Sequence, residues 1–248
     1  MTLGTLVVVP AYGLVEMTRE TVVRLLPEDV DLLVIDNQGD YRRVGRERVV
    51  TPGRNIRWLG ACNLGLRYAA DRRYSHTLLL NNDVHTSPGF VATLVDAARD
   101  RPGRRPVGLA GPLQSGGDVA PTQELEAYTD AYEGVGEDRD AAYVHGAAML
   151  VSRACYAALG PMDVAQLPHG WATDIEYGML ARRAGFRCVV AVGSHMQHFT
   201  RATVMARGAS RGAHVEVARR HVARVLSTRY GPNWQGVLGF DFGWSDPA

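Results

Sequence analysis

The stretch His76-Thr-Leu-Leu-Leu-Asn-Asn-Asp-Val84 determines how the chain is expected to fold. Its apolar first half predicts a short buried strand, and the Asn-Asn-Asp tip is typical of a turn just past a strand end. Ser87-Pro88 then suits the start of a helix. Asp83 should therefore lie at the carboxyl end of a strand, where open α/β sheets bind ligands. A carboxylate flanked by amides suits a divalent cation on a phosphate, but a simple capping turn explains the stretch equally well.

Strand and helix signals alternate through the first half of the chain. Short apolar runs predict strands at residues 6–9, 32–35, 56–59 and 77–80, and helical patterns predict helices at residues 18–26, 63–74 and 89–99. This alternation predicts an α/β fold with a mostly parallel central sheet and helices on both faces. Three of the strands end in tips at residues 10–12, 36–38 and 81–83, which should line up at one edge of the sheet.

The second half of the chain begins with an irregular segment. Residues 114–140 are rich in Gly, Asp, Glu and Ala, and we expect a long flap there that Tyr128 and Tyr132 hold down. Strands are then predicted at residues 143–151 and 186–192, and helices at residues 152–159, 174–184 and 213–230. No internal repeat or low-complexity linker divides the sequence, so a single domain over residues 1–248 is expected.

Composition narrows the class of protein. The 248 residues are 46% hydrophobic and 21% charged with a net charge of +1, so nucleic acid is an unlikely partner. Cys62, Cys155 and Cys188 are scattered and odd in number, which argues against a disulfide framework. The sequence shows no signal peptide and no transmembrane segment. We therefore expect a cytoplasmic protein, with a homodimer and a peripheral membrane contact left open.

Seven motifs occur in a specific order between about residues 5 and 200. They are Val-Val-Val-Pro-Ala-Tyr12, Val-Ile-Asp-Asn37, Gly-Ala-Cys-Asn63, Leu-Asn-Asn-Asp-Val84, His-Gly-Ala-Ala-Met-Leu-Val151, Thr-Asp-Ile-Glu176 and His198. Together they resemble family 2 glycosyltransferases of the GT-A fold, most closely the rhamnosyltransferase-like branch. The resemblance implies a nucleotide-sugar-binding half at residues 1–112, an acceptor and catalytic half at 113–212, and a C-terminal helix and tail at 213–248.

The same resemblance assigns residues to a nucleotide-diphosphate sugar of the UDP or dTDP type. It places Pro10, Ala11 and Tyr12 against the base and ribose, and Asp36 on the edge of the base. Asn63 is expected at a helix start, where free backbone N–H groups favour an anion. The full set of implied donor contacts is Pro10, Ala11, Tyr12, Asp36, Asn37, Asn63, Asn81, Asn82 and Asp83. For Asp36, Asn37 and Asn63, a turn or cap role is the alternative.

A cation site is implied at the Asn-Asn-Asp tip, which resembles the Asp-x-Asp signature of these enzymes. The first acid is replaced by Asn81, so Asp83 is the one carboxylate expected on Mn²⁺ or Mg²⁺. His198 is the second expected ligand, and an imidazole would favour Mn²⁺. A structural histidine is the alternative for His198, and His195 is a weaker candidate for the same role.

The implied catalytic base is Asp174 within Thr173-Asp-Ile-Glu176, where Thr173 replaces an acid of the family pattern. The alternative for Asp174 is a helix N-cap or first-turn acid that complements the helix dipole. His169, Gly170 and Trp171 lie just before it and are expected at the acceptor, although Trp171 could equally anchor the core.

These assignments predict an inverting glycosyltransferase, an enzyme that moves a sugar onto an acceptor hydroxyl of unknown kind. A sugar-phosphate nucleotidyltransferase is a weaker alternative, because residues 10–16 carry no basic group. A non-catalytic nucleotide-sugar-binding module is the other alternative, since Asn81 and Thr173 depart from the family pattern.

Overall fold

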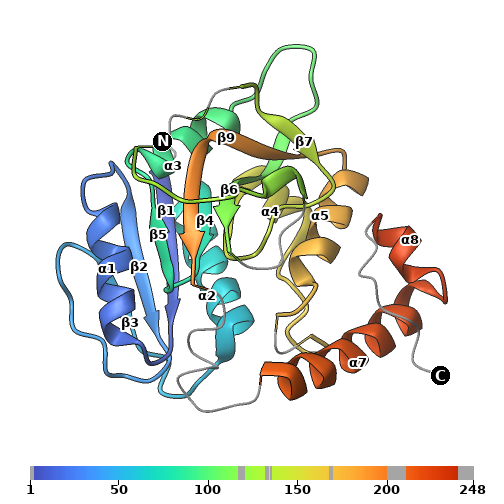
Figure 1. The fold of residues 1–248 in the computed structure, drawn as a ribbon, viewed down its shortest axis with the longest axis horizontal. Helices are drawn as coiled ribbons and strands as arrows, with labels where there is room; N and C mark the ends of the chain where they lie inside the picture. Colours follow the sequence, from blue (N-terminus) through green and yellow to red (C-terminus); the bar gives the residue numbers. More distant parts are fainter. Residues whose placement is uncertain are drawn as a thin grey trace.

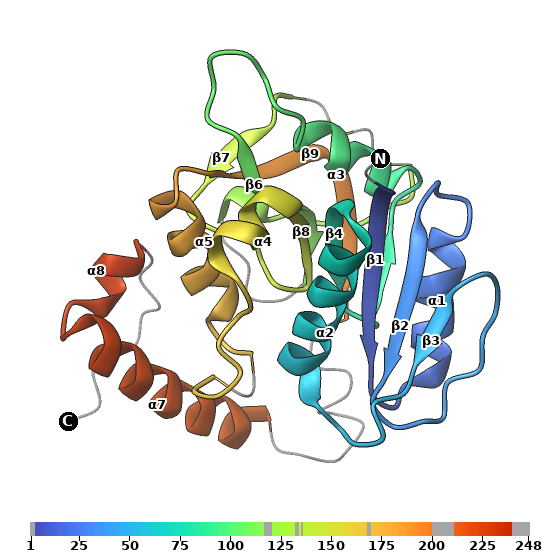
Figure 2. The same ribbon diagram turned by 180° about the vertical axis from the view of Figure 1, so that it is seen from behind.

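A computed structural model describes residues 3–116, 121–131, 134, 136–167, 170–199 and 211–239 (Figures 1 and 2). These residues form one mixed sheet in the order β3-β2-β1-β4-β8-β6-β9-β5, with β7 on β9. The strands are β1 (Leu3–Ala11), β2 (Asp31–Asp36), β3 (Arg48–Val50), β4 (Tyr74–Leu80), β5 (Val84–Thr86), β6 (Val107–Ser115), β7 (Arg139–Ala141), β8 (Ala148–Ser152) and β9 (Arg187–His198). The helices are α1 (Val15–Leu25), α2 (Arg57–Arg72), α3 (Phe90–Ala97), α4 (Arg153–Leu159), α5 (Thr173–Arg183), α7 (Arg211–Tyr230) and α8 (Trp234–Leu238), with a 3₁₀ turn at Pro121–Gln123.

The predicted single α/β domain with helices on both faces is confirmed. Helices α1 and α3 share one hydrophobic cluster with the sheet, whereas α2, α4 and α5 belong to a cluster on the other face. Figure 1 shows α1 in front of the sheet, and Figure 2 shows α2 in front of it. No helix among the described residues has the length and apolar character needed to cross a membrane.

The sheet is parallel only in part. Strands β3, β2, β1 and β4 are parallel, as the alternation of strands and helices predicts. Strand β8 then inserts antiparallel between β4 and β6, and β5 and β7 both pair antiparallel with β9. Of these antiparallel strands, β7 and β8 come from the second half of the chain, where the sequence pattern is least regular, whereas β5 follows the Asn-Asn-Asp tip.

The strand predicted at residues 56–59 is wrong, because this segment starts helix α2. The Asn37 side-chain oxygen accepts from the Ile56 N–H at 3.1 Å, and the Asn55 oxygen accepts from the Arg57 N–H at 2.7 Å. Two amide side chains thus satisfy N–H groups that a helix start leaves without partners. The third strand is instead β3.

Three later strands also differ from expectation. Strand β6 was not predicted, because its sequence VGLAGPLQS carries two glycines and a proline, which weaken the strand signal, although the whole strand is buried. Strand β8 begins only at Ala148, so residues 143–147 form a loop rather than the predicted strand. Strand β9 extends to His198, beyond the predicted end at Val192, and includes His195.

The C-terminal helices pack on α5, away from the sheet (Figure 1). A separate hydrophobic cluster joins Ile175 and Met179 of α5 to Leu226 of α7 and Trp234 and Leu238 around α8. The C-terminal helices therefore pack against the helix that carries Asp174.

Candidate active site

Asp83 and His198 form a buried polar pair at the edge of the sheet. The Asp83 Oδ1 lies 3.3 Å from the His198 Nε2, and the two residues are 5% and 8% exposed. The antiparallel pairing of Val84 with His198 brings the two side chains together. The sequence prediction that these residues share a site therefore agrees with the geometry.

A carboxylate oxygen beside an imidazole nitrogen is a donor set that suits Mn²⁺, so the residues present fit a divalent cation. No group of three or more histidine, cysteine or acidic side chains that could hold a metal ion occurs among the described residues. The protein would thus supply Asp83 and His198, and the remaining ligands would have to be oxygens of a bound substrate and water.

The two asparagines of the tip are held by different helices. Trp58 Nε1 donates to the Asn81 side-chain oxygen at 2.8 Å, which leaves the Asn81 amide nitrogen 3.1 Å from the His198 Nε2. Asn82 is buried and its amide donates to Thr18 Oγ1 at 2.9 Å. Asn81 therefore faces the Asp83–His198 pair, whereas the Asn82 amide nitrogen is engaged by α1, which leaves the Asn82 side-chain oxygen for a bound ligand.

The tips of β1 and β2 lie side by side, because Pro10 and Ala11 pair with Ile35 and Asp36. Both Asp36 oxygens accept backbone N–H groups of the following loop, from residues 38, 39 and 41, at 2.8–3.1 Å. The carboxylate thus orders this loop, and its expected contact with a base stays a prediction. Asn37 likewise links β2 to the start of α2. Tyr12 follows β1 and is half-buried.

Asn63 does not lie at a helix start, and that prediction is wrong. It lies inside α2, where its amide donates to the Met162 carbonyl at 2.8 Å and its oxygen accepts the Met162 N–H at 3.0 Å. Both ends of the side chain are used to hold the loop before α5. We therefore leave Asn63 out of the donor contacts.

Asp174 lies in the first turn of α5 but does not act as its N-cap. The N-cap position is Ala172, and the Asp174 Oδ2 instead accepts the Gly146 N–H at 2.8 Å. Its Oδ1 accepts the N–H of the next residue, Ile175, at 3.0 Å. Burial, followed by the charge of Asp174, raises the pKa of Tyr143. The Asp174 carboxylate is therefore directed at the loop of residues 143–147.

This loop connects the two halves of the site. Gly146 contacts Asp174, the Ala147 carbonyl accepts the Asn81 N–H at 2.8 Å, and the His145 ring lies 5.9 Å from the His198 ring. One short loop thus places the predicted base and the predicted cation ligands at the same edge of the sheet.

Glu176 faces away from this edge. It is 5% exposed, contacts Arg229 and accepts a hydrogen bond from Tyr230 at 2.6 Å. Burial, followed by the bond to Glu176, raises the pKa of Tyr230 to about 12. Glu176 therefore ties α5 to α7, and Asp174 is the acid of this motif that remains for chemistry.

The predicted acceptor residues are only partly described. His169 lies outside the described residues. Trp171 packs against the cluster between α5 and α7, which favours its core-anchor alternative. A Cβ added to Gly170 would lie 2.8 Å from the Trp58 ring, and one added to Gly146 would lie 3.2 Å from it. The backbone at both glycines therefore lies close against Trp58.

Trp58 and Gln114 are site residues that the sequence prediction missed. Trp58 lies in the segment at residues 56–59, for which the sequence predicts a strand, and Gln114 lies at the start of the predicted flap at residues 114–140. Gln114 is fully buried in β6, and its Nε2 lies 3.3 Å from the His198 Nδ1. Because the sequence of β6 gives a weak strand signal, no sequence pattern marked Gln114 as buried.

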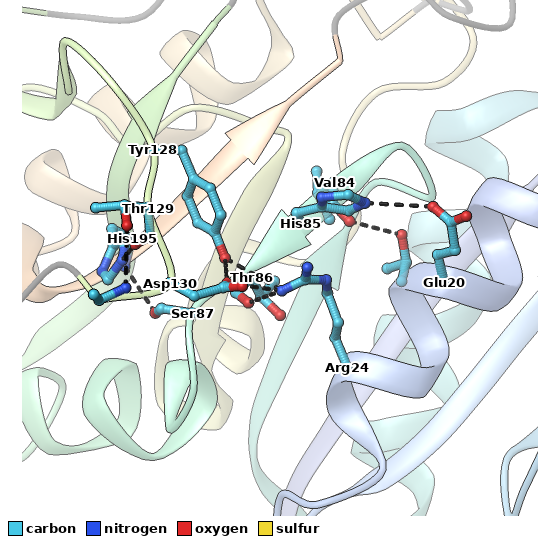
Figure 3. A network of polar contacts seen from close by, with 12 residues as sticks. Glu20, Arg24, Val84, His85, Thr86, Ser87, Tyr128, Thr129, Asp130 and His195 are labelled. Carbon is cyan, nitrogen blue, oxygen red and sulfur yellow. Dashed lines mark hydrogen bonds and ion pairs between the residues drawn. The ribbon is translucent and has the colours of Figure 1, made fainter.

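The flap is held at Tyr128, as predicted, whereas Tyr132 lies outside the described residues (Figure 3). Arg24 of α1 donates to Asp130 at 2.9 Å and to the Tyr128 hydroxyl at 3.3 Å. The His195 Nε2 lies 2.9 Å from the Thr129 carbonyl, so His195 contacts the flap. This contact does not support His195 as a ligand beside Asp83 and His198. Residues 128–130 are thereby fastened to α1 and β9.

Solved structures share this architecture at low sequence identity. A Pyrobaculum calidifontis mannosyltransferase, solved with GDP-Man and Mn²⁺, has a TM-score of 0.62 and 16% identity over 95% of this chain and 68% of its own. GalNAc-T7, solved with UDP, GalNAc and Mn²⁺, has a TM-score of 0.61 and 15% identity. The match covers 79% of this chain and 44% of GalNAc-T7. Staphylococcus aureus TarS gives 0.57 and 12%, with 95% and 42% covered. The fold is thus that of GT-A-like glycosyltransferases.

The family follows from the sequence match. The model described as glycosyltransferase like family 2 matches residues 4–216, so the chain belongs to this family and is a glycosyltransferase. Uncharacterized proteins of Mycobacterium tuberculosis and Mycobacterium bovis are each 33% identical over 236 residues, which is 94% of this chain and 88% of theirs.

Proposed function

We propose that this enzyme transfers a sugar from a nucleotide diphosphate to an acceptor hydroxyl with inversion at the anomeric carbon. The observation that carries the proposal is the loop of residues 143–147, which contacts Asp174 at one end and approaches Asn81 and His198 at the other. A base and a cation site at one strand-end edge are what a single displacement requires. The GDP-Man and Mn²⁺ in one neighbouring structure, and the UDP, GalNAc and Mn²⁺ in another, support this reading.

Asp174 acts as the general base in this proposal. Its carboxylate accepts the proton of the acceptor hydroxyl as that oxygen bonds to the anomeric carbon and the bond to the diphosphate breaks. The Gly146 N–H fixes the carboxylate without giving it a proton. The anomeric centre passes through an oxocarbenium-like state.

Asp83 and His198 are the proposed cation ligands, and Asn81 fixes the edge between them and Trp58. When bound, the cation would neutralise charge on the leaving diphosphate. Pro10, Ala11, Tyr12, Asp36 and Asn37 remain the proposed nucleotide contacts, because they lie on the tips of β1 and β2. The three buried free cysteines suit the expected cytoplasmic location.

A donor panel tests the proposal. UDP-, GDP- and dTDP-sugars, including a rhamnosyl donor for the predicted branch, are incubated with the full chain and Mn²⁺, and released nucleotide diphosphate is measured. We expect one base to stand out and to raise the melting temperature by binding the native state. Once an acceptor is found, retention at the anomeric carbon in the product would refute the single-displacement mechanism.

A further inference from the structure

Gln114 is held in one orientation by the residue two positions ahead. Its Nε2 donates to the Gly116 carbonyl at 2.7 Å, and the same nitrogen lies 3.3 Å from the His198 Nδ1. A backbone carbonyl only accepts hydrogen bonds, so the amide nitrogen must face Gly116 and His198. The Gln114 Oε1 is buried and has no hydrogen-bond partner among the described residues.

His198 is consequently placed between two amide donors. The Gln114 N–H favours a lone pair on Nδ1, whereas the Asn81 N–H, whose orientation Trp58 sets, favours a lone pair on Nε2. A neutral imidazole has one lone pair and one N–H, so only one amide can be satisfied. The Asp83 Oδ1, 3.3 Å from Nε2, accepts the proton when it is on Nε2.

A cation held by His198 would reverse this preference. A cation bound through Nε2 needs the lone pair there, so the proton has to be on Nδ1 with no change in the number of protons on the ring. Nδ1–H then faces a donor unless the Gln114 amide turns over. The turn presents Oε1 to Nδ1–H, gives that oxygen a partner and releases the Gly116 carbonyl.

We propose that Gln114 is a positioning residue that selects the tautomer of His198, and that its amide turns over when a cation binds. The inference rests on the proposed cation site. The structure therefore assigns Gln114 a role in setting cation affinity and in coupling it to the chain at Gly116.

The first test needs no cation. Long-range ¹H–¹⁵N spectra of ¹⁵N-histidine-labelled protein report the tautomer, with His198 assigned by its loss in His198→Gln and His195 as the internal control. We expect Nε2–H in the wild type and Nδ1–H in Gln114→Glu, whose carboxylate only accepts. Nδ1–H in the cation-free wild type would overturn the proposal, whether or not the enzyme transfers sugar.

The second test is a titration of Mn²⁺, alone and with UDP, followed by electron paramagnetic resonance of the free ion. We expect Gln114→Met to lose roughly 10-fold in affinity, while Gln114→Glu binds at least as tightly as the wild type. A role in packing alone predicts the reverse order, because Met fits a buried site and a buried charge does not. Equal affinity in all three proteins, or no binding by the wild type, would overturn the coupling. If Gln114→Glu fails to fold, the wild-type tautomer and Gln114→Met still decide.

Discussion

Asp174 has two backbone partners, and neither of them uses up its ability to accept a proton. An amide at this position keeps one accepting oxygen but does not accept a proton at neutral pH. A helix cap would tolerate Asn, since Asn and Asp cap helices about equally well. The two roles therefore predict different outcomes for one substitution.

We expect Asp174→Asn to lower the transfer rate by roughly 10²-fold or more, because a general base typically contributes 10²–10⁴-fold. Nucleotide affinity and melting temperature should change little. Steady-state kinetics, calorimetry and thermal melts measure the three quantities, with Asp96→Asn, an exposed acid paired with Arg99, as the matched control. Near-normal turnover in Asp174→Asn would remove it as the base.

Asp83 gives a second prediction for a single residue. Asp83→Asn preserves the shape of the side chain but removes the carboxylate that lies beside His198. We expect it to abolish Mn²⁺-dependent binding of the nucleotide diphosphate, since hard cations prefer charged oxygen ligands. His198→Gln should weaken the same binding less, because donor oxygens and water still fill most of the coordination shell. Calorimetry with and without Mn²⁺ checks both, and an unchanged Mn²⁺ effect in Asp83→Asn would contradict the assignment.

The contact between α5 and α7 is a structural clamp built on Glu176. Arg229 of α7 contacts Glu176 and donates to Asp163 at 2.7 Å, so one guanidinium joins α7 to α5 and to the loop before it. The Glu176 side chain is 6% exposed and the Arg229 side chain 24% exposed. Removing the Arg229 guanidinium would leave the buried Glu176 carboxylate with the Tyr230 hydroxyl as a partner but without the positive charge.

We expect Arg229→Met to lower the free energy of unfolding by about 2 kcal/mol, somewhat less than the loss of a fully buried pair, because Arg229 is partly solvated. Arg220→Met on the same helix is the control. Arg220 and Glu216 are exposed, so their separation should cost at most about 0.5 kcal/mol. Urea unfolding measures both, and equal losses would show that the clamp contributes no more than a surface pair.

Arg24 links helix α1 to the flap at Tyr128 and Asp130 (Figure 3). The hydrogen bonds from Tyr128 and then Arg24 lower the pKa of Asp130, so this contact is present at neutral pH and is lost as the pH falls through that lowered pKa. Arg24→Met should therefore speed amide exchange at residues 128–130.

Hydrogen exchange read by mass spectrometry measures the change, with Arg19→Met as the control because Arg19 lies on the same helix and pairs with nearby Glu16. Equal exchange in the two variants would show that Arg24 does not fasten the flap. If transfer also becomes less efficient relative to donor hydrolysis in Arg24→Met, the flap shields the donor from water.

Apolar runs in the sequence predicted β1, β2 and β4 of the parallel part of the sheet and the tip that carries Asp83, but not β3. Strands β1, β2 and β4 have uninterrupted apolar cores, so their pattern survives without knowledge of neighbours. The segment at residues 56–59 is apolar enough to resemble a strand. The N–H groups at the start of its helix are instead accepted by the side chains of Asn37, which is distant in sequence, and Asn55. Strand β6 is extended by pairing on both sides rather than by its own propensity.

The candidate site followed a similar rule. Asp83, His198 and Asp174 belong to recognisable motifs, so the sequence alone marks them as candidates. Trp58 and Gln114 act through contacts between segments far apart in the chain, and their partners Asn81 and His198 become visible only once the sheet is assembled. For the same reason, the bonds from Asn63 to Met162 had no signal in the sequence.

Strand β9 turns a corner between its two legs (Figure 1). Its register on β6 passes from Pro112 opposite Ala191 directly to Leu113 opposite His195, so residues 192–194 loop out between the legs. Residues 188–191 of one leg and residues 195–197 of the other each keep a continuous register on β6, which means that relatives can gain or lose a residue at the corner without disturbing either half. A one-residue insertion within residues 195–198 would instead turn His198 to the opposite face of the sheet. Length changes during the evolution of this enzyme should therefore collect at the corner and be purged from the four residues after it.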